Sequence, residues 1–578
     1  MKRRHFIKSL TISSSVVAST SAFGLPVIVN PKGRPFIKNK KGKELHADVV
    51  IAGGGLGGCA AALAALRNGL RVIMTEETNW IGGQLTQQGV SCPDEHKWIE
   101  EFGATQSYRD LRTAIREYYI RHYPLTGPAK SEKYLNPGNG SVSRLCHEPR
   151  VALAVLHNLL APYLSSTRLT LLLQHKIVNA DADGDNVRAL KARHIENEHE
   201  TILRAPYFID ATELGDLLPL TGTAFVTGAE SRHETHELHS AEKTDPANQQ
   251  AFTLCLAMDY IPETENVIDK PDEYDFWRNY VPHLAPPWSG KLLSLKYSSP
   301  HDLKPKSLGF DPTGGPTDHM LNLWNYRRII DPKNFNAGTY AGGITIVNWP
   351  QNDFLLGNLT GVSEGEYKKT IRRAEQLGLS LFYWLQTEAP RPDGKQGWRG
   401  LRLRGDILGT ENGLAKFPYI RESRRIKAVF TVLEEHVGAE NRAMITGKKE
   451  DNHAAPFYDS VGVGSYHIDL HPTSAGNNYI DFNSLPFQIP LGALLPERMQ
   501  NLIAANKNIG TTHITNGCYR LHPVEWNIGE SAGMLAVYSL KKSIRPHGVR
   551  EKQGMLEDFQ HFIRQQGIET HWPKEILK

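Results

Sequence analysis

Short apolar runs without alternation recur toward both ends of this chain. They are rich in β-branched and other apolar residues, and they span residues 48–52, 70–75, 169–173, 207–209 and 501–505. Runs of this length without a two-residue period predict strands that are buried on both faces of a sheet. An Ala/Leu-rich stretch separates the first two runs, so the chain opens on a predicted strand–helix–strand unit.

Helical periodicity predicts the longer elements. Apolar residues at helix spacing predict helices over residues 97–123, 151–164, 365–387 and from about 520 to about 540. Between residues 225 and 490 the character changes, because candidate strands such as 252–260 and 343–348 alternate there with loops rich in Pro, Trp and Tyr. This region is typical of a mixed α+β domain inserted between the two parts of an α/β domain.

The first strand is followed by a glycine-rich turn. Gly53, Gly55 and Gly58 have G-x-G-x-x-G spacing and open the helix predicted over 57–68. In such a turn the first glycine reverses the chain, the second admits a pyrophosphate to the backbone, and the third lets the helix pack on the sheet. Glu76 lies at the tip of the second strand, about twenty residues further on, where a carboxylate accepts from ribose hydroxyls. The pattern therefore predicts a dinucleotide site; the alternative is a structural β–α–β unit without a nucleotide.

Composition changes this picture only by exclusion. The chain has 578 residues, 22% of them charged, and its net charge of +4 is spread thinly, so nothing indicates a nucleic-acid partner. The five cysteines are far apart and form no C-x-x-C, which argues against zinc, iron–sulfur clusters and a close redox pair. We expect no metal and buried free thiols; a single disulfide is the alternative.

The N-terminus is typical of a targeting signal. Arg3 and Arg4 precede Phe6 and Ile7, and a modestly apolar, serine-rich segment follows over 10–23, as in a twin-arginine export signal. An incidental basic N-terminus is the alternative. The signal predicts a periplasmic protein that meets the twin-arginine export machinery, and we expect no stable membrane anchor because no other segment approaches the length of a span.

Several motifs together resemble the FAD-dependent oxidoreductases of the glutathione-reductase-like flavoprotein superfamily. They are GGGLGG (53–58), WIGGQLT (80–86), FIDATELGDLLPLTG (208–222), YIRESRRI (419–426), SVGVGSYHIDLHPT (460–473), NLIAANKNIG (501–510) and RLHPVEWNIGESAG (520–533). The resemblance implies an α/β protein with a Rossmann-like FAD-binding domain built from both chain ends and an inserted α+β substrate domain.

The expected boundaries follow from this organisation. They are a signal peptide over 1–30, a linker over 31–44, the first part of the FAD-binding domain over 45–222 with a helical insertion at about 91–145, a substrate or cap domain over 223–490, the second part of the FAD-binding domain over 491–545, and a C-terminal tail over 546–578.

The resemblance also implies which residues hold FAD. The pyrophosphate would lie against Gly53, Gly55, Leu56 and Gly58, and the adenosine ribose against Glu76. The adenine would meet the backbone of Ile177 and Val178. The remaining contacts, to the ribityl chain and the pyrimidine end of the flavin, would come from Gly82, Gly83, Gln84, Asn508, Asn527, Ile528 and Gly529.

Candidate bases lie in two places. His467, Asp469 and His471 alternate, so on a strand they share one face, and a histidine there can act as a base near neutral pH. The same pattern is compatible with a metal site or with a plain polar strand face. His522 and Glu525, which flank the start of the last helix, are rival bases.

The arginines of YIRESRRI leave two interpretations open. Arg421, Arg424 and Arg425 have the chemistry to clamp a carboxylate or sulfate of a substrate by bidentate bonds. The alternative is a structural ion-pair network that includes Glu422.

The sequence thus favours an exported oxidoreductase that transfers hydride between a small organic substrate and FAD, with an unidentified electron acceptor. A disulfide reductase fed by NAD(P)H is disfavoured, because a second G-x-G-x-x-G and a cysteine pair are lacking. The alternatives are a flavin monooxygenase that uses NAD(P)H and oxygen, and a binding or assembly protein in which FAD is only structural.

Overall fold

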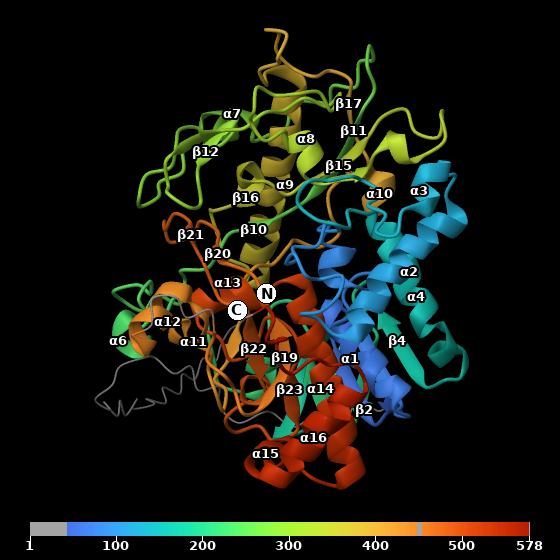
Figure 1. The fold of residues 1–578 in the computed structure, drawn as a ribbon, viewed down its shortest axis with the longest axis vertical. Coiled ribbons are helices and arrows are strands. Elements are labelled where there is room, and N and C mark those ends of the chain that lie inside the picture. The colour runs from blue at the N-terminus through green and yellow to red at the C-terminus, as the bar shows by residue number, and fades with distance from the viewer. Residues whose placement is uncertain (1–42, 448–452, 577–578) are drawn as a thin grey trace, which may run out of the picture.

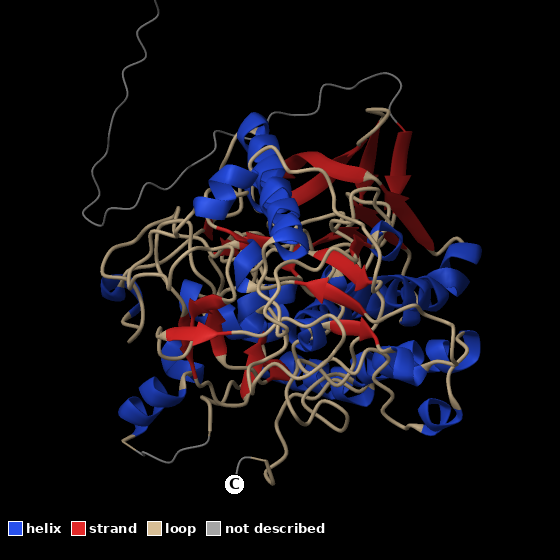
Figure 2. Ribbon diagram, turned by 90° about the horizontal axis from the view of Figure 1, so that it is seen from above, coloured by secondary structure: helices blue, strands red, loops and turns tan. Residues whose placement is uncertain are grey.

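A parallel sheet near one end of the molecule organises the fold. The computed structural model describes residues 43–447 and 453–576 (Figures 1 and 2), so the twin-arginine segment lies outside the described residues. The sheet has five strands in the order β23-β8-β2-β3-β4, all parallel. Its strands are β2 (Val49–Ala52), β3 (Val72–Glu76), β4 (Leu169–Leu173), β8 (Tyr207–Asp210) and β23 (Leu502–Ala504). Because β23 pairs with β8, both ends of the described chain contribute to one sheet.

Two buried helices pack on this sheet with their backbones in contact. They are α1 (Leu56–Arg67) and α14 (His522–Lys542), which cross in the lower part of Figure 1. A Cβ atom on Gly529 would lie 2.0 Å from the carbonyl oxygen of Gly57, and one on Gly57 would lie 1.9 Å from that of Ala505. Glycine is required at both positions because no side chain fits between these backbones.

Two further sheets flank this centre. One has the order β1-β7-β6-β5, and it carries a bulge in β5 at Val178, between the paired residues Ile177 and Asn179. The other, β14-β15-β11-β17, lies with α9 in the upper part of Figure 1. Their elements are β1 (Lys43–His46), β5 (His175–Asp183), β6 (Asn186–His194), β7 (Glu200–Arg204), β11 (Leu256–Tyr260), β14 (Arg328–Ile330), β15 (Ile344–Val347), β17 (Leu401–Leu403) and α9 (Glu364–Thr387).

Five two-stranded pairs and shorter helices complete the fold. The pairs are β9 (Phe225–Val226) with β18 (Arg425–Ile426), β10 (Phe252–Thr253) with β16 (Asp353–Phe354), β12 (Lys296–Ser298) with β13 (Pro305–Ser307), β19 (Ser460–Gly464) with β22 (Phe487–Pro490), and β20 (Ile468–Leu470) with β21 (Ile480–Phe482). The helices are α2 (Gln106–His122), α3 (Gly127–Ser131), α4 (Pro149–Ser165), α5 (Leu217–Thr221), α6 (Arg232–Thr235), α7 (Tyr274–Asn279), α8 (Leu323–Tyr326), α10 (Gly405–Leu408), α11 (Glu434–Val437), α12 (Ala439–Thr446), α13 (His513–Tyr519), α15 (Pro546–Glu551) and α16 (Gln553–Gln565).

Some predicted boundaries are corrected by the structure. The helix expected from residue 97 begins at Gln106, because the Thr105 hydroxyl caps it by accepting from the Tyr108 N–H. The strand expected over 252–260 is two separate strands, β10 and β11. Within the expected C-terminal tail, α15 and α16 pack on α14, and Trp572 is buried.

The cysteine and membrane expectations meet two findings. All five cysteines are free and buried, as the first interpretation predicted. Within residues 43–447 and 453–576, no helix combines the length and the apolar character that crossing a bilayer requires.

Candidate functional site: a cofactor cleft and a buried ion-pair network

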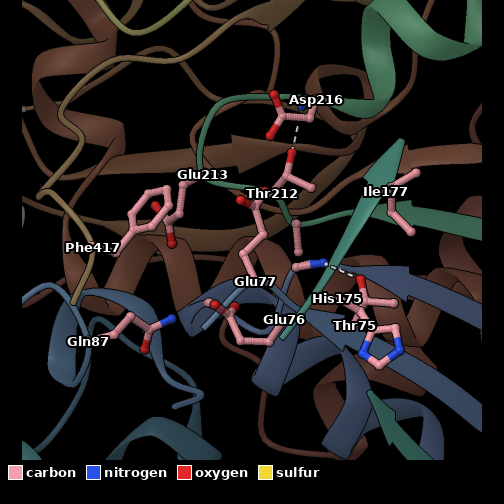
Figure 3. Close-up of a pocket in the computed structure, with 13 residues that line it drawn as sticks. Thr75, Glu76, Glu77, Gln87, His175, Ile177, Thr212, Glu213, Asp216 and Phe417 are labelled. Atoms are coloured by element: carbon pink, nitrogen blue, oxygen red, sulfur yellow. Dashed lines mark hydrogen bonds between the residues drawn. The ribbon is translucent and has the colours of Figure 1, made fainter. Parts of the chain in front are cut away.

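A cleft of about 420 Å³ opens where β2, β3 and β8 end (Figure 3). The carboxyl ends of parallel strands are where ligands bind in open α/β sheets. The cleft is lined by Gly53, Gly55, Thr75, Glu76, Glu77, Gln87, His175, Ile177, Ala211, Thr212, Glu213, Asp216 and Phe417.

The glycine-rich turn forms one wall of the cleft. Gly53 has a φ of 94°, and a Cβ atom there would lie 2.2 Å from the Ala211 oxygen. A Cβ atom on Gly58 would lie 2.0 Å from the Gly53 oxygen, so these two glycines shape the turn itself. Gly55 differs, because only the Glu213 carboxylate comes within 3 Å of its virtual Cβ atom. Gly55 therefore faces the cleft, and the buried Leu56 starts the helix behind it.

Glu76 is tied to the backbone of the same turn. Its Oε2 atom accepts from the Gly54 N–H at 3.0 Å, and its Oε1 atom accepts from the Thr78 N–H at 2.8 Å. Burial raises the pKa of Glu76 to about 8. The carboxylate lines the cleft, as expected for a ribose contact, and it also holds the glycine turn in shape.

The second glycine pair, Gly82–Gly83, lies against the first turn. The Gly82 N–H donates to the Gly54 oxygen at 2.8 Å, and a Cβ atom on Gly83 would lie 3.1 Å from the Gly55 Cα atom. Gln84 follows but points away from the cleft, since its amide donates to the Arg520 oxygen at 2.9 Å and to the Glu525 carboxylate.

The expected adenine site is divided. Ile177 lines the cleft, but Val178 does not. Val178 is the unpaired residue of the bulge in β5, where the ladder to β6 shifts register.

The structure shows internal contacts for the other residues expected to bind FAD, whose role toward the cofactor stays a prediction. Asn508 holds a turn, because its Nδ2 atom donates to the Asp210 oxygen at 3.0 Å. Since α14 begins at His522, Asn527, Ile528 and Gly529 lie more than one turn inside that helix. The Asn527 amide bonds to the backbone of β19, and Gly529 packs against α1. None of the four lines the cleft.

The geometry disfavours His522 as a base. It is fully buried, its Nδ1 atom accepts from the Asp94 N–H at 3.2 Å, and its Nε2 atom lies 2.9 Å from the Val90 oxygen. Burial lowers the pKa of His522 to about 4. Both ring nitrogens are used inside the protein, so neither faces a substrate.

Glu525 is likewise committed to internal partners. Its carboxylate accepts from the Gly57 N–H at 3.3 Å, from Gln84, and from the Lys507 ammonium at 3.2 Å. Lys507 also donates to the Glu213 Oε2 atom at 2.6 Å. Sequence reasoning did not single out Lys507 or Glu213; their only signal was a polar residue directly after a core strand. Burial alone would lower the pKa of Lys507, but Glu213 and Glu525 raise it, so the ammonium stays charged.

A second constellation lies in the middle of the chain. The His471 Nδ1 atom lies 2.6 Å from the Asp353 Oδ2 atom, and Asp353 pairs with Arg421 at 3.1 Å. Asp469 pairs with Arg520 at 3.0 Å, and its Oδ2 atom lies 3.8 Å from the His471 Nε2 atom. Burial would raise the pKa of Asp469, but His471 and Arg520 outweigh it and lower that pKa to about 2.

His467 lies at the other end of β20. Its Nδ1 atom lies 2.9 Å from the Asp481 Oδ1 atom, and 38% of its side chain is exposed. Burial lowers the pKa of His467, but Asp481 and Asp469 more than offset this, so the net shift is upward. The two histidines thus have different carboxylate partners. In the described part of the chain, no group of His, Cys, Asp and Glu side chains is arranged for a metal ion.

The arginines of residues 419–426 form internal ion pairs. Arg425 is fully buried between Glu422 and Glu230, and Arg424 pairs with Asp216 at 3.2 Å. Burial would raise the pKa of Glu422, but His513 and Arg425 lower it to about 2. The geometry agrees with the ion-pair interpretation and leaves no substrate clamp at Arg425.

Comparison with known proteins identifies the class. The profile of a family described as FAD dependent oxidoreductase matches residues 48–563. The chain belongs to this family. It is therefore an FAD-dependent oxidoreductase with a mixed α/β fold, and FAD is its cofactor. The glycine turn, with Glu76 and Ile177 beside it, fits the adenosine and pyrophosphate part of that cofactor.

Individual relatives are distant. The chain is 31% identical over 109 residues to sarcosine oxidase subunit alpha of Corynebacterium sp. (strain U-96). The matched stretch covers 18% of this chain and 11% of that protein. A geranylgeranyl bacteriochlorophyll reductase-like protein from Thermoplasma acidophilum gives a TM-score of 0.31 at 12% identity, over 91% of this chain and 85% of that one. A variant of the E. coli quinol fumarate reductase FrdA gives a TM-score of 0.31 at 11% identity. That match covers 91% of this chain and 74% of the FrdA chain.

Proposed function

We propose that this oxidoreductase transfers hydride between a small organic substrate and FAD, with His471 as the base. Bound FAD supplies the group that accepts or donates the hydride. The observation that carries the proposal is the pair formed by the buried Asp353 and the partly exposed His471, at 2.6 Å. A carboxylate at Nδ1 fixes the imidazole tautomer and leaves Nε2 as the atom that takes a proton from a substrate C–OH or C–N group.

The surroundings of the pair support this assignment. Arg421 holds Asp353 in place at 3.1 Å, so the imidazole has a rigid partner. The His471 side chain is 18% exposed, whereas His522 is fully buried. A proton acceptor for a diffusing substrate must be reachable, and His471 meets this condition.

Direct contacts connect the pair to the cofactor side of the molecule. Asp469, next to His471, binds the Arg520 guanidinium at 3.0 Å. The Arg520 backbone oxygen accepts from Gln84 at 2.9 Å, and Gln84 adjoins the glycine pair that contacts the first turn. This chain of contacts makes His471 a better candidate than His467, whose Asp481 lies on the hairpin strand β21.

The test is an anaerobic screen of alcohols, amines, acids and sugars for compounds that bleach the flavin. We expect at least one small molecule to reduce it without NAD(P)H. If no compound does so, a protein that only carries FAD becomes the better hypothesis. If NAD(P)H bleaches the flavin and substrate accelerates this step, the protein is a monooxygenase.

We further propose export to the periplasm by the twin-arginine machinery, on the basis of Arg3 and Arg4 in the N-terminal sequence. Replacing both by Lys retains the charge but removes the recognised pair. The precursor should then remain in the cytoplasm, as cell fractionation would show. Normal delivery of the double variant to the periplasm would contradict this route.

A further inference from the structure

One carboxylate oxygen in the cofactor cleft has no partner. Glu213 follows β8, and its side chain is 10% exposed. Its Oε2 atom accepts from Lys507 at 2.6 Å, but its buried Oε1 atom makes no hydrogen bond within the described protein. In Figure 3, Glu213 is drawn with Phe417 on the side of the cleft opposite His175 and Ile177.

The unpartnered oxygen is aimed between the two glycine turns. It lies 2.6 Å from the position of a Cβ atom on Gly55 and 3.0 Å from that of a Cβ atom on Gly83. A Cβ atom on Gly83 would also lie 2.8 Å from the Leu56 N atom, so both glycines are close-packed positions, and the Glu213 Oε1 atom lies against them at the edge of the cleft.

A buried carboxylate oxygen in such a place calls for a donor. Lys507 is a buried cation 2.6 Å from the other oxygen of the same carboxylate. An ionised carboxylate only accepts hydrogen bonds, and leaving a buried acceptor unpaired costs free energy. The ligand of the cleft is able to supply this donor.

Only part of FAD offers such donors at this point. Phosphate oxygens carry no proton at neutral pH and would repel the carboxylate, whereas sugar hydroxyls donate. Glu76 already stands where the adenosine ribose is expected, at the tip of β3. Gly83 packs against Gly55, with its virtual Cβ atom 3.1 Å from the Gly55 Cα atom, and it belongs to the glycine pair that the family resemblance assigns to the ribityl chain.

We propose that Glu213 accepts a hydrogen bond from a ribityl hydroxyl of FAD and that Lys507 fixes the carboxylate for this purpose. Glu213 is then a residue that distinguishes FAD from ADP, because ADP has the adenosine and both phosphates but no ribityl chain. This inference rests on FAD as the cofactor and is independent of which substrate the enzyme oxidises or reduces.

The experiment compares FAD and ADP binding to the full chain freed of FAD, after the wild type is shown to regain the cofactor. Glu213→Ala should lower the affinity for FAD by about tenfold to a hundredfold, the usual range for a hydrogen bond to a charged group. Its affinity for ADP should stay within about twofold of the wild-type value. The FAD affinity of Glu213→Gln should lie between those of the wild type and Glu213→Ala, because an amide oxygen is a weaker acceptor than a carboxylate oxygen. Lys507 stays paired with Glu525 at 3.2 Å in both variants, so we expect them to fold.

Glu77→Ala is the matched control, because Glu77 lines the same cleft but pairs with Lys176 at 3.4 Å. This variant should not change the affinity for FAD relative to the affinity for ADP. The proposal is overturned if Glu213→Ala tightens both ligands, which would mark the carboxylate as a repulsive group at the phosphates. It is also overturned if both ligands weaken equally, which would indicate a structural role, or if neither changes.

Discussion

The cofactor cleft and the ion-pair network treat buried carboxylates in opposite ways. Burial raises the pKa of Glu76 in the cleft to about 8 and that of Asp210, at the end of β8 beside the cleft, to about 7, because their partners are neutral backbone and hydroxyl groups. In the network, burial acts in the same direction, but nearby cationic groups outweigh it and lower the pKa of Glu422 and Asp469 to about 2. Glu76 and Asp210 thus limit the negative charge beside the glycine turn, whereas the network fixes its charge; Glu213, which lines the same cleft, is paired with Lys507 and is the exception to this contrast.

The difference matches what each region must do. A site for an anionic pyrophosphate is weakened by ionised carboxylates, so neutral partners and a helix N-terminus suit it. A base such as His471 needs a carboxylate that remains ionised and immobile, and Arg421 provides this for Asp353. The glycine-turn wall of the cleft is thus shaped by backbone, whereas the network is shaped by charged side chains.

The largest expected effect is at the backbone contact behind the cleft. Gly529→Val should destabilise the protein by more than about 4 kcal/mol or prevent folding, because a Cβ atom there would lie 2.0 Å from the Gly57 oxygen. Gly554→Val is the control, since nothing lies within 4 Å of a Cβ atom at Gly554 in α16. Thermal melts check this. Similar melting temperatures for the two variants would contradict the packing role of Gly529.

The same substitution in the cleft should spare the fold. Gly55 has a φ of −63°, which valine adopts, and only the end of the Glu213 side chain lies within 3 Å of its virtual Cβ atom. Gly55→Val should therefore give a folded protein whose FAD affinity falls by at least about a hundredfold, because the valine fills the pyrophosphate's space. Flavin content and circular dichroism of the purified variant decide this. A yellow variant with normal FAD affinity would show that the pyrophosphate lies elsewhere.

Substitutions in the ion-pair network should change the rate of flavin reduction but not the binding of FAD. His471→Ala should slow anaerobic flavin reduction by about a hundredfold, the usual cost of losing a general base. Asp353→Asn should slow it less, because it disturbs the tautomer and orientation of His471 but leaves the base. Both variants should keep their FAD. His467→Ala is the control, since its partner is Asp481; a larger loss in this variant would transfer the role of base to His467.

The two regions also differ in how far the sequence predicts them. The Gly53–Gly58 turn and the strands around it are local patterns, so they were predicted within a few residues. The contact of Gly529 with α1 was not predicted, because small residues in a helix serve a flat ligand and close helix packing equally well, and only the position of α1 reveals the packing. Asp353 was missed because its partner His471 lies 118 positions away in the sequence. No local pattern predicts such a pairing.

The smallest effect separates the regions by pH. Glu422 has a folded pKa of about 2, below its usual 4.5, so it stabilises the protein above pH 4.5, and this contribution is lost as the pH falls from 4.5 toward 2. Glu76 has a folded pKa of about 8, above its usual 4.5, so its contribution is present below pH 4.5 and is lost as the pH rises toward 8. The two regions thus lose stability at opposite ends of the pH range.

Glutamine variants make this contrast measurable, because an amide of the same shape does not titrate. In protein freed of FAD, Glu422→Gln should flatten the dependence of the melting temperature on pH between about 2 and 4.5, and Glu76→Gln should flatten it between about 4.5 and 8. We expect changes of a few degrees, since the Arg425–Glu230 pair remains in the first variant and the Gly54 and Thr78 N–H groups still find an amide oxygen in the second. If Glu76→Gln instead alters the acid side, the Glu76 carboxylate is ionised at neutral pH, and the cleft handles charge as the network does.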